Sequence, residues 1–346
     1  MKHKKKLLPV WLLVIIDILV IAAYTLGFYG LFYLTPRQLE STSIKTNIAE
    51  TAAASSETEA DSDAEIEADT ETDENTNTDT ETDTTTTEDL AAKFAEHFTD
   101  TVVSTSTSYS SENISVTLKK HTEGSGDNII TYYVADIYVA DITCLQSGFA
   151  DDTYGVGYTQ DLLDMDESLN AILAMNGDFY GNGGNSVVIR NGEVYRTSDG
   201  DSDVCVLYYD GTMKTYTAQE FDVDQAIEDG AWQAWCFGPA LLDDSGNSLT
   251  SFTTEGRLKS ENPRSAVGYY EPGHYCFVVV DGRQSGYSVG MTLTQLSELF
   301  DELGCDTAYN MDGGKSSSMT YDDALVNQPT DGGREVSDCI VIKEVE

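Results

Sequence analysis

The sequence has little of the chemistry from which metal sites are commonly built. Its 346 residues include only 4 histidines, which are isolated from one another, and 6 cysteines, none of which forms a CxxC pair. Zinc sites need closely spaced cysteine or histidine ligands, so a zinc centre is disfavoured. The spacing of the six cysteines does not show which of them would pair as disulfides. Several lie inside apolar runs such as "YCFVVV", where cysteine also acts as a small buried hydrophobe.

Positive charge is equally scarce. Lysine and arginine together number 19 against 60 acidic residues, and the formal net charge is −41. This balance excludes a general nucleic-acid-binding function, which needs clustered basic residues. Only seven arginines occur in the chain, so the places where they gather are informative.

One long apolar run stands near the amino end, at Leu7–Leu34, behind a lysine-rich tail at residues 1–6. A helix of about 20 apolar residues is enough to cross a bilayer. The run therefore predicts a single transmembrane anchor with the tail in the cytoplasm and the rest of the chain outside, at the cell membrane. Asp17 is an isolated charge within the predicted span.

The segment 38–89 is rich in threonine and acidic residues, with "TETDENTNTDTETDTTTTED" as its extreme. It lacks the apolar periodicity that would offset the entropy of ordering. We expect a disordered acidic stalk here, and much of the net charge lies in it. Residues 90–346 then form one extracellular domain with ample apolar content for a core.

Strand and hairpin patterns dominate this domain. Ile130–Val139 alternates as a strand does, while Val187–Arg196 and Val204–Tyr216 each carry an Asn-Gly or Asp-Gly turn between two short runs. Helical spacing appears at Thr159–Leu169 and, more clearly, at Thr292–Gly304. The sequence predicts an α+β fold with antiparallel and mixed sheet and a few packed helices, in which functional loops lie at strand ends.

Four polar segments each follow a short apolar run. They are "AILAMNGDFYGNGG" (171–184), "NPRSAVGY" (262–269), "FVVVDGRQSG" (277–286) and "TAYNMDGGKSSSM" (307–319). Each alone is typical of a turn, but Arg264, Arg283 and Arg334 lie within or near them. Guanidinium groups suit phosphate or carboxylate recognition, so together the segments indicate an anion-binding site.

The segments "MNGDFY", "FGPAL", "NPRSAVG", "VVVDGRQSGYSVGMTLTQLSELFDELGCDTAYNMDGGKSSSM" and "REVSDCIVI", in this order, resemble the phosphodiester glycosidase family. The resemblance covers roughly residues 132–342. It implies a hydrolase that cleaves a sugar 1-phosphodiester, releasing the sugar and leaving a phosphomonoester. The implied partner is a phosphodiester-linked glycan of the envelope or an exopolysaccharide.

The resemblance also implies which residues form the site. Asp312 takes the leading acid/base or electrostatic role, with Asp281 and Asp178 as competitors. The implied substrate-binding residues are Asn176, Gly177, Arg264, Arg283, Asn310, Gly313, Gly314, Ser316, Ser317 and Arg334. Of these, Arg264 and Arg283 would hold the phosphate, and the two glycines of "DGG" would let backbone N–H groups approach it closely. Two positions depart from the family pattern. The family usually has a glycine or another small residue where Asp178 stands, and a glycine where Lys315 stands.

Other interpretations stay open at the level of sequence. The domain could bind anionic glycan without catalysis, or it could be a metal-dependent phosphodiesterase that cuts the other P–O bond. No cofactor is firmly implied, but a divalent cation held by Asp178, Asp281 and Asp312 is the alternative that those acids suggest. Asp281 and Asp312 could instead make an Asx turn or an ion pair with arginine that pins strand ends together.

Overall fold

The computed structural model describes residues 10–29, 35–42, 44–46, 89–182, 186–198, 200–252, 254 and 256–345. The predicted cytoplasmic tail and most of the predicted stalk lie outside the described residues.

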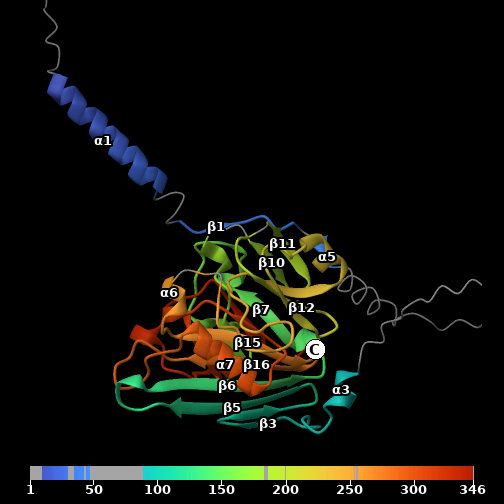
Figure 1. The fold of residues 1–346 in the computed structure, drawn as a ribbon. Helices are drawn as coiled ribbons and strands as arrows, with labels where there is room; N and C mark the ends of the chain where they lie inside the picture. Colours follow the sequence, from blue (N-terminus) through green and yellow to red (C-terminus); the bar gives the residue numbers. More distant parts are fainter. Residues whose placement is uncertain are drawn as a thin grey trace, which may run out of the picture.

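Helix α1 (Val10–Tyr29) lies within the predicted transmembrane segment (Figure 1). In the described part of the chain, no helix has the length and apolar character needed to cross a membrane. The prediction of a transmembrane anchor at residues 7–34 is therefore not supported. The charged Asp17 lies within the described helix.

The largest sheet has seven strands in the order β17-β15-β16-β6-β5-β4-β3, and each neighbouring pair is antiparallel. Its strands are β3 (Val103–Thr105), β4 (Ser108–Ser110), β5 (Ile114–Glu123), β6 (Ile130–Val139), β15 (Arg264–Glu271), β16 (His274–Val280) and β17 (Thr307–Asn310). Strand β6 has the bounds predicted from its alternating pattern, so that prediction is confirmed.

Both faces of the inner strands β6 and β16 are buried, because successive side chains along a strand point to opposite faces. On one face, Ile137 and Phe277 belong to the main core. On the other, Val134 and Val278 pack with the apolar stripe of helix α7 (Leu293–Leu303). The sheet is therefore the central layer of the domain.

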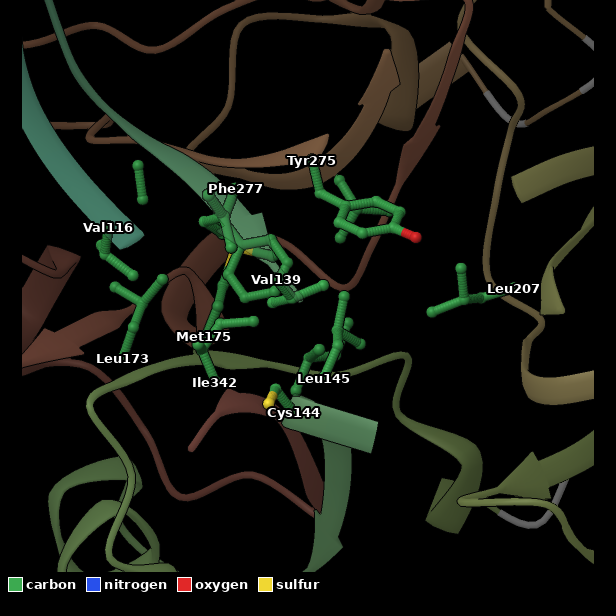
Figure 2. Packing of buried hydrophobic residues seen from close by; sticks show 14 of the residues in the cluster. Val116, Val139, Cys144, Leu145, Leu173, Met175, Leu207, Tyr275, Phe277 and Ile342 are labelled. Carbon is green, nitrogen blue, oxygen red and sulfur yellow. The ribbon is translucent and has the colours of Figure 1, made fainter. Parts of the chain in front are cut away.

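The main core joins this central sheet to a second sheet. Figure 2 shows Val139 and Phe277 of the seven-stranded sheet beside Leu173, Met175 and Ile342. These three belong to a five-stranded sheet with the order β19-β18-β9-β20-β7. Its strands are β7 (Leu145–Phe149), β9 (Leu173–Asn176), β18 (Met319–Tyr321), β19 (Ala324–Leu325) and β20 (Asp338–Ile342).

A third sheet has the order β13-β12-β14-β10-β11-β2. Its strands are β2 (Ile44–Lys45), β10 (Val187–Arg190), β11 (Glu193–Thr197), β12 (Val204–Tyr208), β13 (Met213–Tyr216) and β14 (Ala231–Trp235). The pairs β10–β11 and β12–β13 are the two hairpins predicted from the Asn-Gly and Asp-Gly turns. Leu207 and Trp235 of this sheet also enter the main core, so three sheets share one hydrophobic interior.

Few helices accompany these sheets. Helix α7 begins with a capping box between Thr292 and Gln295 and ends at Gly304, whose φ of 80° suits glycine. The others are α3 (Leu90–Lys93), α4 (Leu162–Leu169), α5 (Val223–Glu228) and α6 (Gly256–Lys259). Helices α4 and α7 lie where the apolar spacing predicted them. The α+β prediction is confirmed, and the strand pairings within the described residues are antiparallel.

Two short strands lie at or within the start of the predicted stalk at residues 38–89. β1 (Arg37–Gln38) pairs with β8 (Gly155–Val156), and β2 (Ile44–Lys45) pairs with β11. Backbone pairing does not need apolar periodicity, and therefore composition did not reveal these strands.

Candidate functional site

Three strand ends of the central sheet meet at one edge. Strand β15 begins at Arg264, which is paired with Val280 at the end of β16. On its other side, Ala266 of β15 is paired with Asn310 at the end of β17. Because both neighbours are antiparallel to β15, the segments "NPR", "DGR" and "NMDGG" lie together at this edge.

The remaining polar segment, "NGD" after β9, approaches the same edge from the five-stranded sheet. The backbone N–H of Asn176, at the end of β9, donates to the Ser318 carbonyl at 3.3 Å, and the Asp312 N–H donates to the Gly177 carbonyl at 3.3 Å. The loop 311–318 thus connects the two sheets and holds "NG" against "MDGG".

A cavity of about 510 Å³ opens beside these loops. Its lining contains five cationic side chains and, among the described residues, a single carboxylate, Asp312. The lining residues are Phe179, Phe237, Arg257, Leu258, Asn262, Pro263, Arg264, Arg283, Asn310, Met311, Asp312, Gly313, Gly314, Lys315 and Arg334. Four of the seven arginines in the whole chain therefore line one cavity, which marks it as an anion-binding site in an acidic protein.

Asp312 is held by three donors. Its Oδ1 accepts from the Gly313 N–H at 2.9 Å, and its Oδ2 accepts from the Ser316 hydroxyl at 2.6 Å and from Nη2 of Arg334 at 2.7 Å. Burial raises the pKa of the Asp312 carboxyl above its usual range, while the hydroxyl and the guanidinium act in the opposite direction. The carboxylate is thus oriented at the wall of a cationic cavity.

Two of the three guanidinium nitrogens of Arg264 are hydrogen-bonded to backbone carbonyls of the protein. Its Nε donates to the Met291 carbonyl at 2.9 Å, and its Nη2 donates to the carbonyls of Leu258 and Ser260 at 2.6 and 2.7 Å. Burial and the neighbouring Arg283 lower the pKa of Arg264 to about 10. Nη1 makes no hydrogen bond within the described residues, and it is the part of the group left for an anion.

Arg283 enters the cavity from a left-handed backbone position with φ of 58°. Its Nη2 donates to Oδ1 of Asn262 at 2.7 Å. Gly314 leaves the space that this guanidinium occupies, because a Cβ there would lie 3.3 Å from its two terminal nitrogens. The exposed end of Arg283 is positioned for a ligand in the cavity.

The two glycines of "DGG" have a different role from the predicted one. The Gly313 N–H donates to the Asp312 side chain, and the Gly314 N–H donates to the Pro263 carbonyl at 3.0 Å. Neither amide is left for an anion, so the prediction of a backbone phosphate cradle is wrong. A Cβ on Gly313 would lie 2.9 Å from the Pro263 oxygen, and close packing of two loops is what requires glycine there.

The predicted asparagines differ in their access to the cavity. Asn310 lines it, donates from Nδ2 to the Gly238 carbonyl at 2.8 Å, and has an Oδ1 that is buried without a partner among the described residues. Asn176 lies behind the wall, where Nδ2 donates to the Asp312 carbonyl at 2.7 Å and Oδ1 accepts from the Ser265 hydroxyl at 2.6 Å. Asn310 forms part of the cavity wall, and Asn176 supports the Asp312 backbone.

Asp281 is buried away from the cavity lining. Its Oδ1 accepts from Nδ2 of Asn327 at 2.8 Å, its Oδ2 accepts from the Tyr287 hydroxyl at 2.8 Å, and the Gln328 N–H lies 3.1 Å from both oxygens. The carboxylate pins the loop after β19 to the end of β16. This role is structural, but the partners are an amide, a phenol and a backbone N–H rather than the arginine expected from the sequence.

Asp178 also lies outside the lining. Its Oδ1 accepts from Nη2 of Arg190 at 2.8 Å and from the Tyr180 N–H at 3.1 Å, and its Oδ2 accepts from the Cys236 N–H at 2.8 Å. Gly177 lies next to this group, since a Cβ there would be 2.4 Å from the carboxyl of Asp338. The structure therefore separates Asp178 and Asp281 from Asp312.

The serines of "KSSSM" are buried. Ser316 holds Asp312, the Ser318 hydroxyl donates to the Ser316 carbonyl at 2.9 Å, and the buried Ser317 hydroxyl has no partner among the described residues. Lys315 lines the cavity and also forms an ion pair with Asp331 at 2.8 Å.

Eight lining residues were not predicted as site residues, and they include Arg257, Phe179 and Phe237. The scarcity of arginine is a signal that could have identified Arg257. The two phenylalanines stand in quoted segments, "NGDFY" and "FGPAL", but an aromatic residue in a loop carries no such signal alone.

The comparisons with known proteins agree with this fold. The family model for phosphodiester glycosidase matches residues 169–343. The chain belongs to the phosphodiester glycosidase family, whose members are hydrolases.

Two relatives illustrate the extent of the likeness. An uncharacterized SPbeta prophage-derived protein, YomE of Bacillus subtilis, is 32% identical over 196 residues, which is 55% of this chain and 30% of that protein. This chain thus matches less than a third of the length of that relative. The zebrafish N-acetylglucosamine-1-phosphodiester alpha-N-acetylglucosaminidase catalytic domain, auto-inhibited by its pro-peptide, is 18% identical. It superposes with a TM-score of 0.55 over 67% of this chain and 84% of that domain, which shows a shared fold.

Proposed function

We propose that this chain hydrolyses a sugar 1-phosphodiester, releasing the sugar and leaving a phosphomonoester on the acceptor. The observation that supports the proposal is the cavity in which five cationic side chains surround the carboxylate of Asp312. A phosphodiester supplies the negative charge that these cations match, and the sugar C1 is the carbon at which positive charge develops when its bond to oxygen breaks.

The arginines stabilise the leaving group. When the C1–O bond breaks, the bonding electrons stay on the phosphate oxygen, and the phosphomonoester leaves as an anion. Arg283, Arg257 and the free Nη1 of Arg264 offer donors to it. A phosphate that leaves as a stabilised anion needs no proton from a general acid, so one carboxylate in the cavity is sufficient.

Asp312 acts on the sugar or on the attacking water, rather than on the leaving phosphate. As a carboxylate it stabilises the oxocarbenium-like charge at C1, or it takes the proton from the attacking water. Arg334, bonded to its Oδ2, orients it and favours the ionised form, against the effect of burial. Asn310, with an unpartnered Oδ1, orients water or a sugar hydroxyl.

The substrate class that we propose is a phosphodiester-linked glycan of the cell envelope or an exopolysaccharide. Within the described residues there is no group of three or more His, Cys, Asp or Glu that could hold a metal ion.

The test uses the full chain and a synthetic α-sugar 1-phosphodiester in ¹⁸O-labelled water. We expect the label in the released sugar, because water attacks C1. Asp312→Asn should lower kcat/KM by about 100-fold or more. Asp244→Asn, at an exposed carboxylate outside the cavity, is the matched control and should keep wild-type turnover.

Other results would point to the alternatives. Label in the phosphate would mean that the P–O bond breaks, as in a metal-dependent phosphodiesterase. Binding of the substrate without formation of a phosphomonoester would indicate a non-catalytic glycan-binding module. Full turnover by a folded Asp312→Asn variant would remove Asp312 from the chemistry.

A further inference from the structure

Phe179 has a backbone conformation that bulky residues rarely adopt. Its φ is 64°, in the left-handed region, where a residue with a Cβ is strained. Hydrogen bonds hold it there, since its N–H donates to Asp338 at 3.3 Å and the next N–H, of Tyr180, donates to Asp178 at 3.1 Å. Strain of this kind persists only where the surroundings enforce it, and it is concentrated at functional sites.

The two aspartates are themselves fixed by one arginine. Nη2 of Arg190 lies 2.8 Å from Asp178 and 3.0 Å from Asp338, and all three side chains are buried. Breaking such a buried ion pair leaves an uncompensated charge, so the arrangement is rigid. Asp178 also accepts from the N–H of Cys236, directly before Phe237. The network therefore fixes the backbone that carries both aromatic residues of the cavity.

The ring of Phe179 lies against the residue that orients Asp312. The central carbon of the Arg334 guanidinium is 5.0 Å from the ring centroid, within the range of a cation–π contact. The same guanidinium donates from Nη2 to Asp312 at 2.7 Å and from Nε to Ser316 at 2.6 Å. The Arg334 side chain is 43% exposed, and exposed ion pairs contribute little by themselves. The ring supplies a third contact beside those to Asp312 and Ser316.

We propose that Phe179 is a positioning residue of the site, and that its ring holds the Arg334 guanidinium against the Asp312 carboxylate. The proposal rests on the proposed function, because its readout is turnover. It explains why a strained backbone and a buried ion-pair network lie directly behind the cavity.

The cations around Asp312 determine how the pH profile of kcat/KM should respond to loss of the ring. Among the described residues, Arg334 is the cation bonded to it. The other cations that line the cavity are Arg257, Arg264, Arg283 and Lys315. Losing the close cation disfavours the ionised carboxylate. The acid limb of the pH profile of kcat/KM should then move to higher pH.

The variants separate the ring from the backbone strain. Phe179→Gly removes the ring but accepts the left-handed conformation, so it is expected to fold. Phe179→Tyr keeps the ring. In Phe179→Gly we expect kcat to fall about tenfold or more and the acid limb to move up by about half a pH unit or more. Phe179→Tyr should restore both to near the wild-type values.

An unchanged pH profile and kcat in Phe179→Gly, with an active wild type, would overturn the proposal. So would a loss of kcat without a shift of the acid limb, since that result describes a purely structural residue. If the wild type itself fails to turn over the substrate, the proposed function is what has failed.

A separate observation concerns two of the six cysteines. Cys276 on β16 and Cys305, directly after α7, are both buried, and their sulfur atoms lie 3.8 Å apart. Gly268 on the neighbouring strand makes this space, because a Cβ there would lie 2.7 and 2.8 Å from the two sulfurs. The geometry points to a disulfide between Cys276 and Cys305 that links the central sheet to the end of α7.

The bond would form while the chain folds. Each thiol gives up one proton and one electron as the S–S bond forms. A small disulfide such as oxidised glutathione takes up the two electrons and two protons and is reduced to two thiols. Burial raises the pKa of the Cys276 thiol, so in the folded protein the reactive thiolate is scarce.

The test is to refold the full chain with oxidised glutathione, alkylate the remaining thiols and identify linked peptides by mass spectrometry. We expect one link, between Cys276 and Cys305, and a rise in Tm of about 5 °C that is absent in Cys305→Ser. Alkylation of both residues, or a link to another cysteine, would contradict the assignment.

Discussion

Asp281 holds a loop in place through both of its carboxylate oxygens. Asn327 and Tyr287 each donate to one oxygen at 2.8 Å, and the Gln328 N–H lies within 3.1 Å of both. In Asp281→Asn, an amide NH₂ faces one of these donors, so a buried donor loses its acceptor. We expect the free energy of unfolding to fall by about 1–3 kcal/mol, measured by urea denaturation.

The same variant separates stability from chemistry. Asp281 lies outside the cavity lining, so kcat/KM of folded Asp281→Asn should fall far less than that of Asp312→Asn. Equal losses in the two variants, at equal fractions folded, would place Asp281 in the chemistry.

At the scale of the element, helix α4 carries an unusual buried acid. Asp166 is 1% exposed, and neither carboxylate oxygen has a hydrogen-bond partner among the described residues. Burial raises the pKa of Asp166 to about 6, with the nearby Thr320 hydroxyl acting in the opposite direction. In the unfolded chain an aspartate titrates near 3.9.

The sign of the resulting pH dependence follows from proton uptake. Between about pH 4 and pH 6 the folded state keeps a proton that the unfolded state has lost. Raising the pH through this window therefore lowers the free energy of unfolding, by roughly 3 kcal/mol in total from this group. Asp166→Asn should lack this component when urea unfolding is compared at pH 4.5 and pH 7. Identical pH dependence in both proteins would show that Asp166 does not titrate in this window.

At the scale of the whole molecule, a strongly acidic chain presents one cationic cavity. The formal net charge is −41, yet five cations line the site. We expect inorganic phosphate to bind there and to inhibit competitively. Its Kd should rise several-fold between about 50 and 300 mM salt, because exposed charges are screened.

Matched variants test this binding by calorimetry. Arg283→Met should weaken phosphate binding, because Arg283 presents its guanidinium to the cavity. Lys214→Met removes a cation that lies on another surface and should leave the affinity unchanged. Equal weakening in both variants would mean that phosphate responds to the overall charge rather than to the cavity.

Local patterns in the sequence were enough to predict much of the fold. The alternation of Ile130–Val139, the turns of two hairpins and the apolar stripe of α7 are each consequences of neighbours along the chain. Motifs with fixed spacing likewise identified the loops that meet at the site and the family. These properties depend on a few consecutive residues, so the sequence by itself determined them.

Which carboxylate faces the cavity was decided only by the tertiary structure. Asp178, Asp281 and Asp312 all follow short apolar strands, but their partners come from distant segments: Arg190 for the first, Asn327 for the second and Arg334 for the third. The same holds for the amides of Gly313 and Gly314, which are used by Asp312 and Pro263. Burial and hydrogen bonding across the fold assign these roles, because they depend on contacts between residues far apart in the chain.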